Sequence, residues 1–256
     1  MSFELLALPA FRDNYIWLLA ATHSAAVVDP GEPEPVRGAL AQRGLTLSAI
    51  LLTHHHADHV GGALALAREF GCPIYGPAAE AIPGVNYPLR EGDPVAIPAL
   101  QLQLRTREIP GHTAGHIAYH GHNIVFCGDT LFSAGCGRLF EGTAAQMSAS
   151  LAKIAALPDA TAVCCGHEYT VANLRFAQLV EPENREIRIY AEQAAERRRQ
   201  NLPTLPSTLA LERQVNPFLR CREPAVIDAA ERHAGHALND AIEVFAVIRN
   251  WKDTFH

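Results

Sequence analysis

The sequence predicts an α+β protein, with a mixed domain over residues 1–172 and a smaller all-helical domain over residues 173–256. Short apolar runs rich in β-branched and aromatic residues, each bounded by turn signals, dominate the first part. After Gly166 only helical patterns follow. The charge changes near the same place, because residues 1–172 carry the whole net charge of −6 and residues 173–256 are balanced. A length of 256 residues suits one or two domains.

Strands are expected where a short apolar run ends in a turn signal, such as Asp29-Pro30-Gly31. No convincing strand pattern follows Cys165. The expected strands cover residues 3–8, 15–20, 25–28, 49–52, 73–75, 100–107, 117–120, 124–127 and 161–165.

Helices are expected where apolar residues recur at helical spacing, as at Met147, Leu151 and Ile154. Gly44 and Gly71 end the first two helices, because glycine readily adopts the left-handed conformation found at helix C-termini. The expected helices cover residues 35–43, 60–70, 144–157, 170–179, 187–201, 224–233 and 239–254.

Composition argues against several classes of protein. Nucleic-acid-binding proteins usually carry a basic excess, and this chain has a net charge of −6. No run of about 18 apolar residues occurs, so no membrane association is expected. The N-terminus lacks the basic and apolar regions of a secretory signal. The six cysteines include no Cys-x-x-Cys pair, so we expect a cytoplasmic protein with reduced thiols.

The strongest chemical signal is the stretch Thr53-His54-His55-His56-Ala57-Asp58-His59. It follows an apolar strand and precedes a helix, so its side chains can converge just beyond the strand end. His54 and His56 are two residues apart and share a face if the segment is extended. Imidazole and carboxylate donors at this density suit Zn²⁺ or Fe²⁺ and are enough for two ions.

Three further segments place metal-binding side chains beside expected strands. A glycine-punctuated loop holds His112 and His116, Asp129 follows the strand over 124–127, and His167 follows the strand over 161–165. Each segment alone is weak, but one shared site at a sheet edge explains all of them. His116 is expected to make a structural hydrogen bond and not to bind metal.

This arrangement resembles the metallo-β-lactamase superfamily, whose most specific mark, His-x-His-x-Asp-His, is intact at residues 54–59. The resemblance implies an αββα sandwich with two metal ions at one edge. One ion would be held by His54, His56 and His112, the other by Asp58, His59 and His167, and Asp129 would bridge both. Asp29, which follows the strand over 25–28, is the candidate carboxylate for orienting a ligand histidine.

Seven protein ligands on two ions leave room for a bridging water. Catalytic metal sites keep such a position, and two cations lower the pKa of that water to about 7 or below. The metal-bound hydroxide would be the nucleophile, with Asp58 and Asp129 as the catalytic carboxylates. We expect zinc, with iron or manganese as alternatives, since His and Asp accept all three.

Segments outside the metal motif resemble glyoxalase II, the hydroxyacylglutathione hydrolases. The likeness covers essentially the whole chain and is strongest in residues 135–142, 166–170, 216–220 and 249–253. It implies a thioester hydrolase that cleaves S-(2-hydroxyacyl)glutathione. With S-D-lactoylglutathione the products are D-lactate and glutathione, the second step of methylglyoxal detoxification.

By the same resemblance, Arg249 and Lys252 bind the glycine carboxylate of glutathione, and Arg138, Phe140 and Tyr169 add further contacts. Residues three apart on a helix share a face, so Arg249 and Lys252 would be able to hold one anion. Some family members have Lys and Tyr at the positions of Arg138 and Phe140. Phe140 lacks a hydroxyl, so we expect glutathione binding to lose one hydrogen bond, about 0.5–1.5 kcal/mol.

Two other functions stay open at this point. The first is a mononuclear iron persulfide dioxygenase of the same superfamily, which metal stoichiometry and oxygen uptake would distinguish. The second is a non-catalytic or RNA-directed member, which the negative charge and the complete ligand set disfavour. A monomer is expected, because no exposed apolar stripe is evident.

Overall fold

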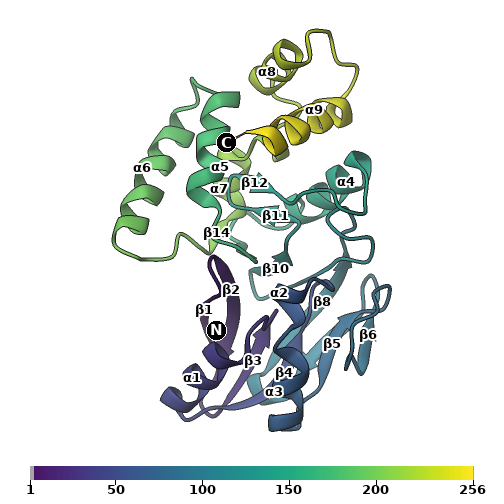
Figure 1. The fold of residues 1–256 in the computed structure, drawn as a ribbon, viewed down its shortest axis with the longest axis vertical. Coiled ribbons are helices and arrows are strands. Elements are labelled where there is room, and N and C mark those ends of the chain that lie inside the picture. The colour runs from purple at the N-terminus through teal and green to yellow at the C-terminus, as the bar shows by residue number, and fades with distance from the viewer. Residues whose placement is uncertain (1–2, 256) are drawn as a thin grey trace. The chain divides into compact units, whose positions relative to one another are not determined.

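The computed structural model describes residues 3–255, which divide into two units (Figure 1). The first unit comprises the chain up to Glu108 together with Thr113–Gly128 and Cys164–His167. The second comprises Ile109–His112, Asp129–Val163 and the chain from Glu168 onwards. The chain therefore passes between the units several times and not once.

A six-stranded sheet forms one layer of the first unit. The strands β1, β2 and β3 are antiparallel, and β3 to β6 run parallel to one another. All seven residues of β2 are buried, as expected for a strand with packed layers on both faces. In spatial order the strands are β1 (Glu4–Ala10), β2 (Asn14–Ala20), β3 (Ser24–Val28), β4 (Thr46–Leu51), β5 (Ile74–Pro77) and β6 (Tyr87–Leu89).

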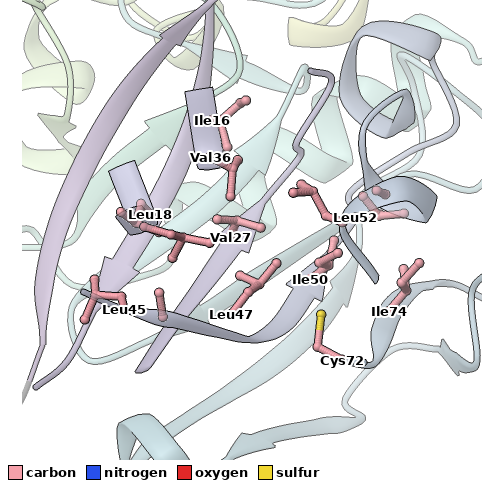
Figure 2. Packing of buried hydrophobic residues seen from close by; sticks show 14 of the residues in the cluster. Ile16, Leu18, Val27, Val36, Leu45, Leu47, Ile50, Leu52, Cys72 and Ile74 are labelled. Carbon is pink, nitrogen blue, oxygen red and sulfur yellow. The ribbon is translucent and has the colours of Figure 1, made fainter. Parts of the chain in front are cut away.

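Helices α1 (Pro33–Arg43) and α3 (Ala63–Phe70) contribute to the core on one face of this sheet. Figure 2 shows Ile16 and Leu18 from β2 and Ile50 from β4 in the same apolar cluster. These residues alternate along their strands and therefore point to one face. The expected end of α1 is confirmed, because Gly44 has φ +63°.

A second sheet has the order β14-β13-β10-β9-β8-β7. The Tyr119 hydroxyl of β9 donates to the Leu52 carbonyl at 2.8 Å, so this sheet contacts the chain at the end of β4. The strands β7 (Pro94–Ile97), β8 (Leu102–Glu108), β9 (Ile117–Gly121) and β10 (Ile124–Gly128) lie in the first unit and are antiparallel. The short 3₁₀ helix η1 (Pro98–Leu100) connects β7 to β8.

The second unit is largely helical, and the predicted α+β class is confirmed. Its strands are β11 (Leu131–Phe132), β12 (Gly135–Cys136), β14 (Ser207–Thr208) and the start of β13 (Ala162–Cys165). Its helices are α4 (Ala144–Ala155), α5 (Thr170–Val180), α6 (Arg185–Arg199), α7 (Leu209–Val215), the 3₁₀ helix η2 (Pro217–Leu219), α8 (Pro224–Ala234) and α9 (Ala241–Thr254). Across the described chain, no helix combines the length and apolarity that a membrane crossing requires.

A buried carboxylate joins α7 to the β11–β12 hairpin. Glu212 is fully buried and accepts hydrogen bonds from the Ser133 hydroxyl at 2.7 Å and the Ala134 N–H at 2.8 Å. The Asn216 amide donates to the same carboxylate at 3.1 Å. Burial raises the pKa of Glu212, although these hydrogen bonds favour its charged form. The turn of the hairpin therefore depends on one acidic side chain.

The single helix predicted over residues 60–70 is wrong, because the structure has α2 (Ala57–Val60) and α3 separated by Gly61 and Gly62. The Gly62 N–H donates to the Pro30 carbonyl at 2.9 Å instead of continuing α2. A Cβ at Gly61 would lie 2.6 Å from the Gly31 carbonyl oxygen. The close approach of the loop after β3 therefore breaks the helix.

The expectation of no strand after Cys165 is also wrong. The two-residue β14 pairs with β13, and α7, which no pattern indicated, follows it directly. Two residues are too few to show an alternating pattern. No sequence pattern predicted β6 or β7, which contain proline and lie at the edges of their sheets.

Candidate metal centre

The motif at residues 53–59 begins just past β4 and ends in α2. Because β3 and β4 are parallel, the residues that follow them emerge at the same edge of the sheet. Asp29 follows β3 and accepts hydrogen bonds from the Thr53 N–H at 2.8 Å and the Thr53 hydroxyl at 2.7 Å. These bonds fix the start of the motif against the neighbouring strand.

Asp58, His59 and His167 come together in the first unit, with one ligand atom from each lying within 4.8 Å of the others. The Nε2 atoms of His59 and His167 lie 3.6 Å and 3.4 Å from Asp58 Oδ2. His167 follows β13, and its backbone forms a bridge with Asn14 of β2. Two imidazole nitrogens thus face one carboxylate oxygen.

Each of these two histidines is bound on its other nitrogen by a buried or half-buried carboxylate. His59 Nδ1 donates to Asp29 at 3.0 Å, and His167 Nδ1 donates to Asp13 at 2.8 Å. A carboxylate can only accept, so each ring carries its proton on Nδ1 and presents Nε2 as a lone-pair donor. Carboxylate–histidine pairs of this kind orient metal-binding imidazoles in proteins.

His54 and His56 lie beside this group. His54 Nε2 is 3.1 Å from His56 Nδ1, and His54 is fully buried. The His116 ring stacks on His54 with centroids 4.6 Å apart, and its Nδ1 donates to the Ile117 carbonyl at 3.1 Å. His116 therefore makes a structural hydrogen bond, as the sequence predicted.

His112 and Asp129 belong to the second unit, where His112 Nε2 lies 3.5 Å from Asp129 Oδ2. His112 Nδ1 donates to the Arg138 carbonyl at 2.9 Å, so Nε2 is the nitrogen that faces Asp129. Gly137 passes so close that a Cβ there would meet both the Asp129 carbonyl and the His112 ring. The predicted ligands are thus divided between the units, five in the first and two in the second.

Arg249 does not lie open to solvent as a substrate-binding side chain would. It is 4% exposed, its Nη1 donates to the Cys136 carbonyl at 2.7 Å, and its Nη2 donates to Asp253 at 3.0 Å. Arg138 is 63% exposed in its side chain, and its Nε lies 3.3 Å from the same Asp253 carboxylate. Lys252 is half-buried. Arg138 and Lys252 are therefore the more accessible cations of this group.

The pKa of Lys252 is lowered, first by burial and then by the positive charges of Arg249 and Arg138. Asp253 acts in the opposite direction and favours the charged amine. The lysine nitrogen also lies 5.6 Å from the centroid of the Phe176 ring. Arg138, Arg249 and Lys252 thus form a cationic cluster that contains one carboxylate, Asp253.

The two predicted aromatic contacts are both at the surface of the second unit. Phe140 is 62% exposed, and its ring meets the His112 ring edge-on with centroids 5.2 Å apart. Tyr169 is 36% exposed and packs edge-on against Phe132 at 5.1 Å. Both rings are exposed to solvent.

Sequence reasoning missed several partners of the predicted residues. Asp13 binds His167, and the Asn14 amide donates to Asp58 Oδ2 at 2.9 Å. Glu80 contacts His55, and Asp253 contacts Arg249. The one available signal was the polar turn Arg12-Asp13-Asn14 between two predicted strands.

Two family models together match most of the chain. Residues 10–167 match the metallo-beta-lactamase superfamily, and residues 168–255 match the hydroxyacylglutathione hydrolase C-terminus. A hydroxyacylglutathione hydrolase from Nitrosomonas eutropha is 53% identical over 96% of this chain and 96% of its own length. One from Alkalilimnicola ehrlichii is 56% identical over 98% of both chains.

A solved structure, ETHE1 from Myxococcus xanthus, has a TM-score of 0.67 and 28% identity, and covers 98% of this chain and 91% of its own. Its identity is about half that of the hydrolases above. The site, both family models and these relatives lead to one conclusion: the chain belongs to the hydroxyacylglutathione hydrolase family, within the metallo-β-lactamase superfamily.

Proposed function

We propose that this protein hydrolyses S-(2-hydroxyacyl)glutathione, with S-D-lactoylglutathione as the substrate and D-lactate and glutathione as products. The observation that carries the proposal is the group of Asp58, His59 and His167, whose two imidazoles are each held by an outer carboxylate. The name shared by the curated relatives supports the same substrate class. This reaction would be the second step of methylglyoxal detoxification.

The donor set fits two divalent metal ions, and we propose zinc, with iron or manganese as the alternatives. His54, His56 and His112 would hold one ion, Asp58, His59 and His167 the other, and Asp129 both. The fit is supported by three ligand atoms within 4.8 Å in the first unit and by the His112–Asp129 pair in the second. When bound, such ions supply a hydroxide at neutral pH and polarise the thioester carbonyl.

With the metal ions bound, the reaction needs neither a general acid nor a nucleophilic side chain from the protein. The oxygen of water adds to the thioester carbonyl carbon, one proton of that water passes to solvent, and the C–S bond breaks to give the 2-hydroxy acid and the thiolate of glutathione. Asp129 would hold the attacking water. Because a thiol has a pKa of about 8.5, the thiolate leaves without a general acid. Cys136 is not needed as a nucleophile, and burial raises its pKa.

Glutathione carries two carboxylates, and a protein of net charge −6 needs local cations to bind it. We propose that Arg138 and Lys252 make the direct ionic contacts, that Arg249 supports them through Asp253, and that Phe140 and Tyr169 cover the bound thiol portion. Arg138 and Arg249 both lie within 3.3 Å of the same Asp253 oxygen, which supports this division of roles. The catalytic domain would span residues 1–172, and the glutathione-binding helical domain residues 173–256.

We further propose that the protein acts as a monomer in the cytoplasm. Its six cysteines are all buried, as is usual for thiols that stay reduced there.

Loss of thioester absorbance from S-D-lactoylglutathione tests the function, with metal content measured on the same sample. Rapid turnover with close to two metals per chain is the expected result, and Asp129→Ala should abolish turnover and lower the metal content. A fully metallated protein without turnover would refute the proposal. Oxygen consumption with glutathione persulfide would then favour the iron dioxygenase.

A further inference from the structure

Glu80 lies in the turn after β5 and has no place in the metal motif. Because β4 and β5 are parallel neighbours, the residues that follow both strands emerge at the same sheet edge. Glu80 is thus placed beside the loop that contains His54 and His56. Its side chain is 3% exposed, which is unusual for a carboxylate and requires hydrogen-bonding partners.

The partners of Glu80 come from two loops that carry predicted metal ligands. Its Oε2 lies 3.1 Å from Nδ1 of His55, the residue between His54 and His56. Its Oε1 accepts hydrogen bonds from the Thr113 hydroxyl and from the Gly115 N–H, the latter at 3.2 Å. Thr113 is the residue directly after His112 in the chain.

The local backbone is shaped to let this carboxylate approach. A Cβ at Gly115 would lie 2.5 Å from Glu80 Cγ and 3.0 Å from the Ala79 Cβ, so only glycine fits there without displacing the turn. The two loops also meet through the stack of His54 on His116 and through the Ile117 N–H, which donates to the Thr53 carbonyl at 2.9 Å. Glu80 is a buried acidic side chain at this junction that bonds to both loops.

We propose that Glu80 is a positioning residue that joins the two loops and thereby sets the affinity of the site for its metal ions. It touches no predicted ligand atom itself and acts through His55, Thr113 and Gly115. The proposal rests on the metal role proposed above. Partners outside the ligand shell typically change metal affinity by 10- to 100-fold.

The test uses the full-length apo protein and measures Zn²⁺ affinity by competition with a coloured chelator. Glu80→Ala should weaken zinc binding by about 10- to 100-fold. Glu80→Gln keeps an acceptor for Gly115 and should lose less. Gly115→Ala, which displaces the carboxylate without removing it, should weaken binding in the same direction as Glu80→Ala. The visible spectrum of the Co²⁺-substituted protein should change in the Ala variants, because it reports the arrangement of the imidazoles.

Glu181 supplies a matched control. Its side chain is also 3% exposed, and it is held by two hydrogen bonds from Arg220 in the second unit. Glu181→Gln should leave the zinc affinity within about threefold of wild type, so a general loss of stability is separated from a positioning effect. Raising the zinc concentration should restore thioester turnover in Glu80→Gln, because the described partners of Glu80 include none of the residues proposed to bind substrate.

The outcomes separate the two proposals. If the wild-type protein binds no zinc, iron or manganese, the metal role fails and this inference fails with it. If wild type binds zinc, and Glu80→Gln and Gly115→Ala bind it equally well, the positioning role alone is overturned. Should Glu80→Ala not fold, those two milder variants decide the question.

Discussion

Replacing Glu212 by alanine should destabilise the protein by about 3–5 kcal/mol. The carboxylate is fully buried and accepts from the Ser133 hydroxyl, the Ala134 N–H and the Asn216 amide. Each buried donor left without a partner costs about 1–3 kcal/mol, and water entering the vacated space recovers part of this. The remaining loss is large against a typical folding free energy of about 5–15 kcal/mol.

Urea unfolding followed by far-UV circular dichroism measures this free energy. Glu69→Ala is the control, because Glu69 pairs with Arg37 at an exposed position, where an ion pair is worth little. A loss below about 1 kcal/mol in Glu212→Ala would refute the argument that this carboxylate holds the hairpin.

The pH dependence of the unfolding free energy gives a second test of the role of Glu212. Burial raises its folded pKa, so its contribution to stability is fully present below the unfolded value of about 4.3 and is lost as the pH rises through the folded value. The stability gap between wild type and Glu212→Gln should therefore be wider at pH 5 than at pH 8. An equal gap at both pH values would contradict the raised pKa.

Three further predictions concern the site. Asp13→Ala should weaken zinc binding about 10- to 100-fold in a chelator competition, because His167 loses the carboxylate that orients it; unchanged affinity would count against that role. Lys252 has a lowered pKa and loses its charge as the pH rises through that value, so KM for the thioester should rise with alkaline pH in wild type and less in Lys252→Arg; parallel profiles would exclude Lys252 from anion binding. Gly128→Ala should lower the melting temperature, since Gly128 has φ +46° and a Cβ would lie 2.3 Å from Thr53 Oγ1; a melting temperature equal to wild type would show that the backbone can relax there.

Much of the fold was predictable because its signals are local. Short apolar runs bounded by turn signals marked the buried strands, and Gly44 and Gly71 adopt the left-handed backbone expected at the ends of α1 and α3. The motif at residues 54–59 was equally easy to recognise, because its whole pattern lies within six consecutive residues. Short elements such as β14 offer too few residues for any periodic signal.

The outer carboxylates were not predictable in the same way, with Asp29 as the exception. Asp29 follows a strand next to the motif, whereas Asp13 binds a histidine 154 residues away. The chain holds 27 acidic residues, and nothing local distinguishes Asp13 or Glu80 from the others. Arg249 illustrates the same limit, since the resemblance implied a contact with the glutathione carboxylate, whereas its buried setting follows from Cys136 and Asp253. Residue type indicates which chemistry is possible, and tertiary structure decides which partner is present.

The pairing of the N-terminal hairpin with the segment after β13 bears on how the protein is made. The Trp17 indole donates to the Cys165 carbonyl at 2.9 Å, and Asp13 accepts from His167. The first two strands therefore cannot complete their contacts until residues about 150 positions later have been synthesised. Contacts of such long sequence separation slow folding. A nascent chain that has exposed Asp58 and His59 still lacks His167 and the backbone that orders the turn at Asp13. On the proposed metal role, the complete group of Asp58, His59 and His167 therefore forms only in chains whose synthesis has passed β13.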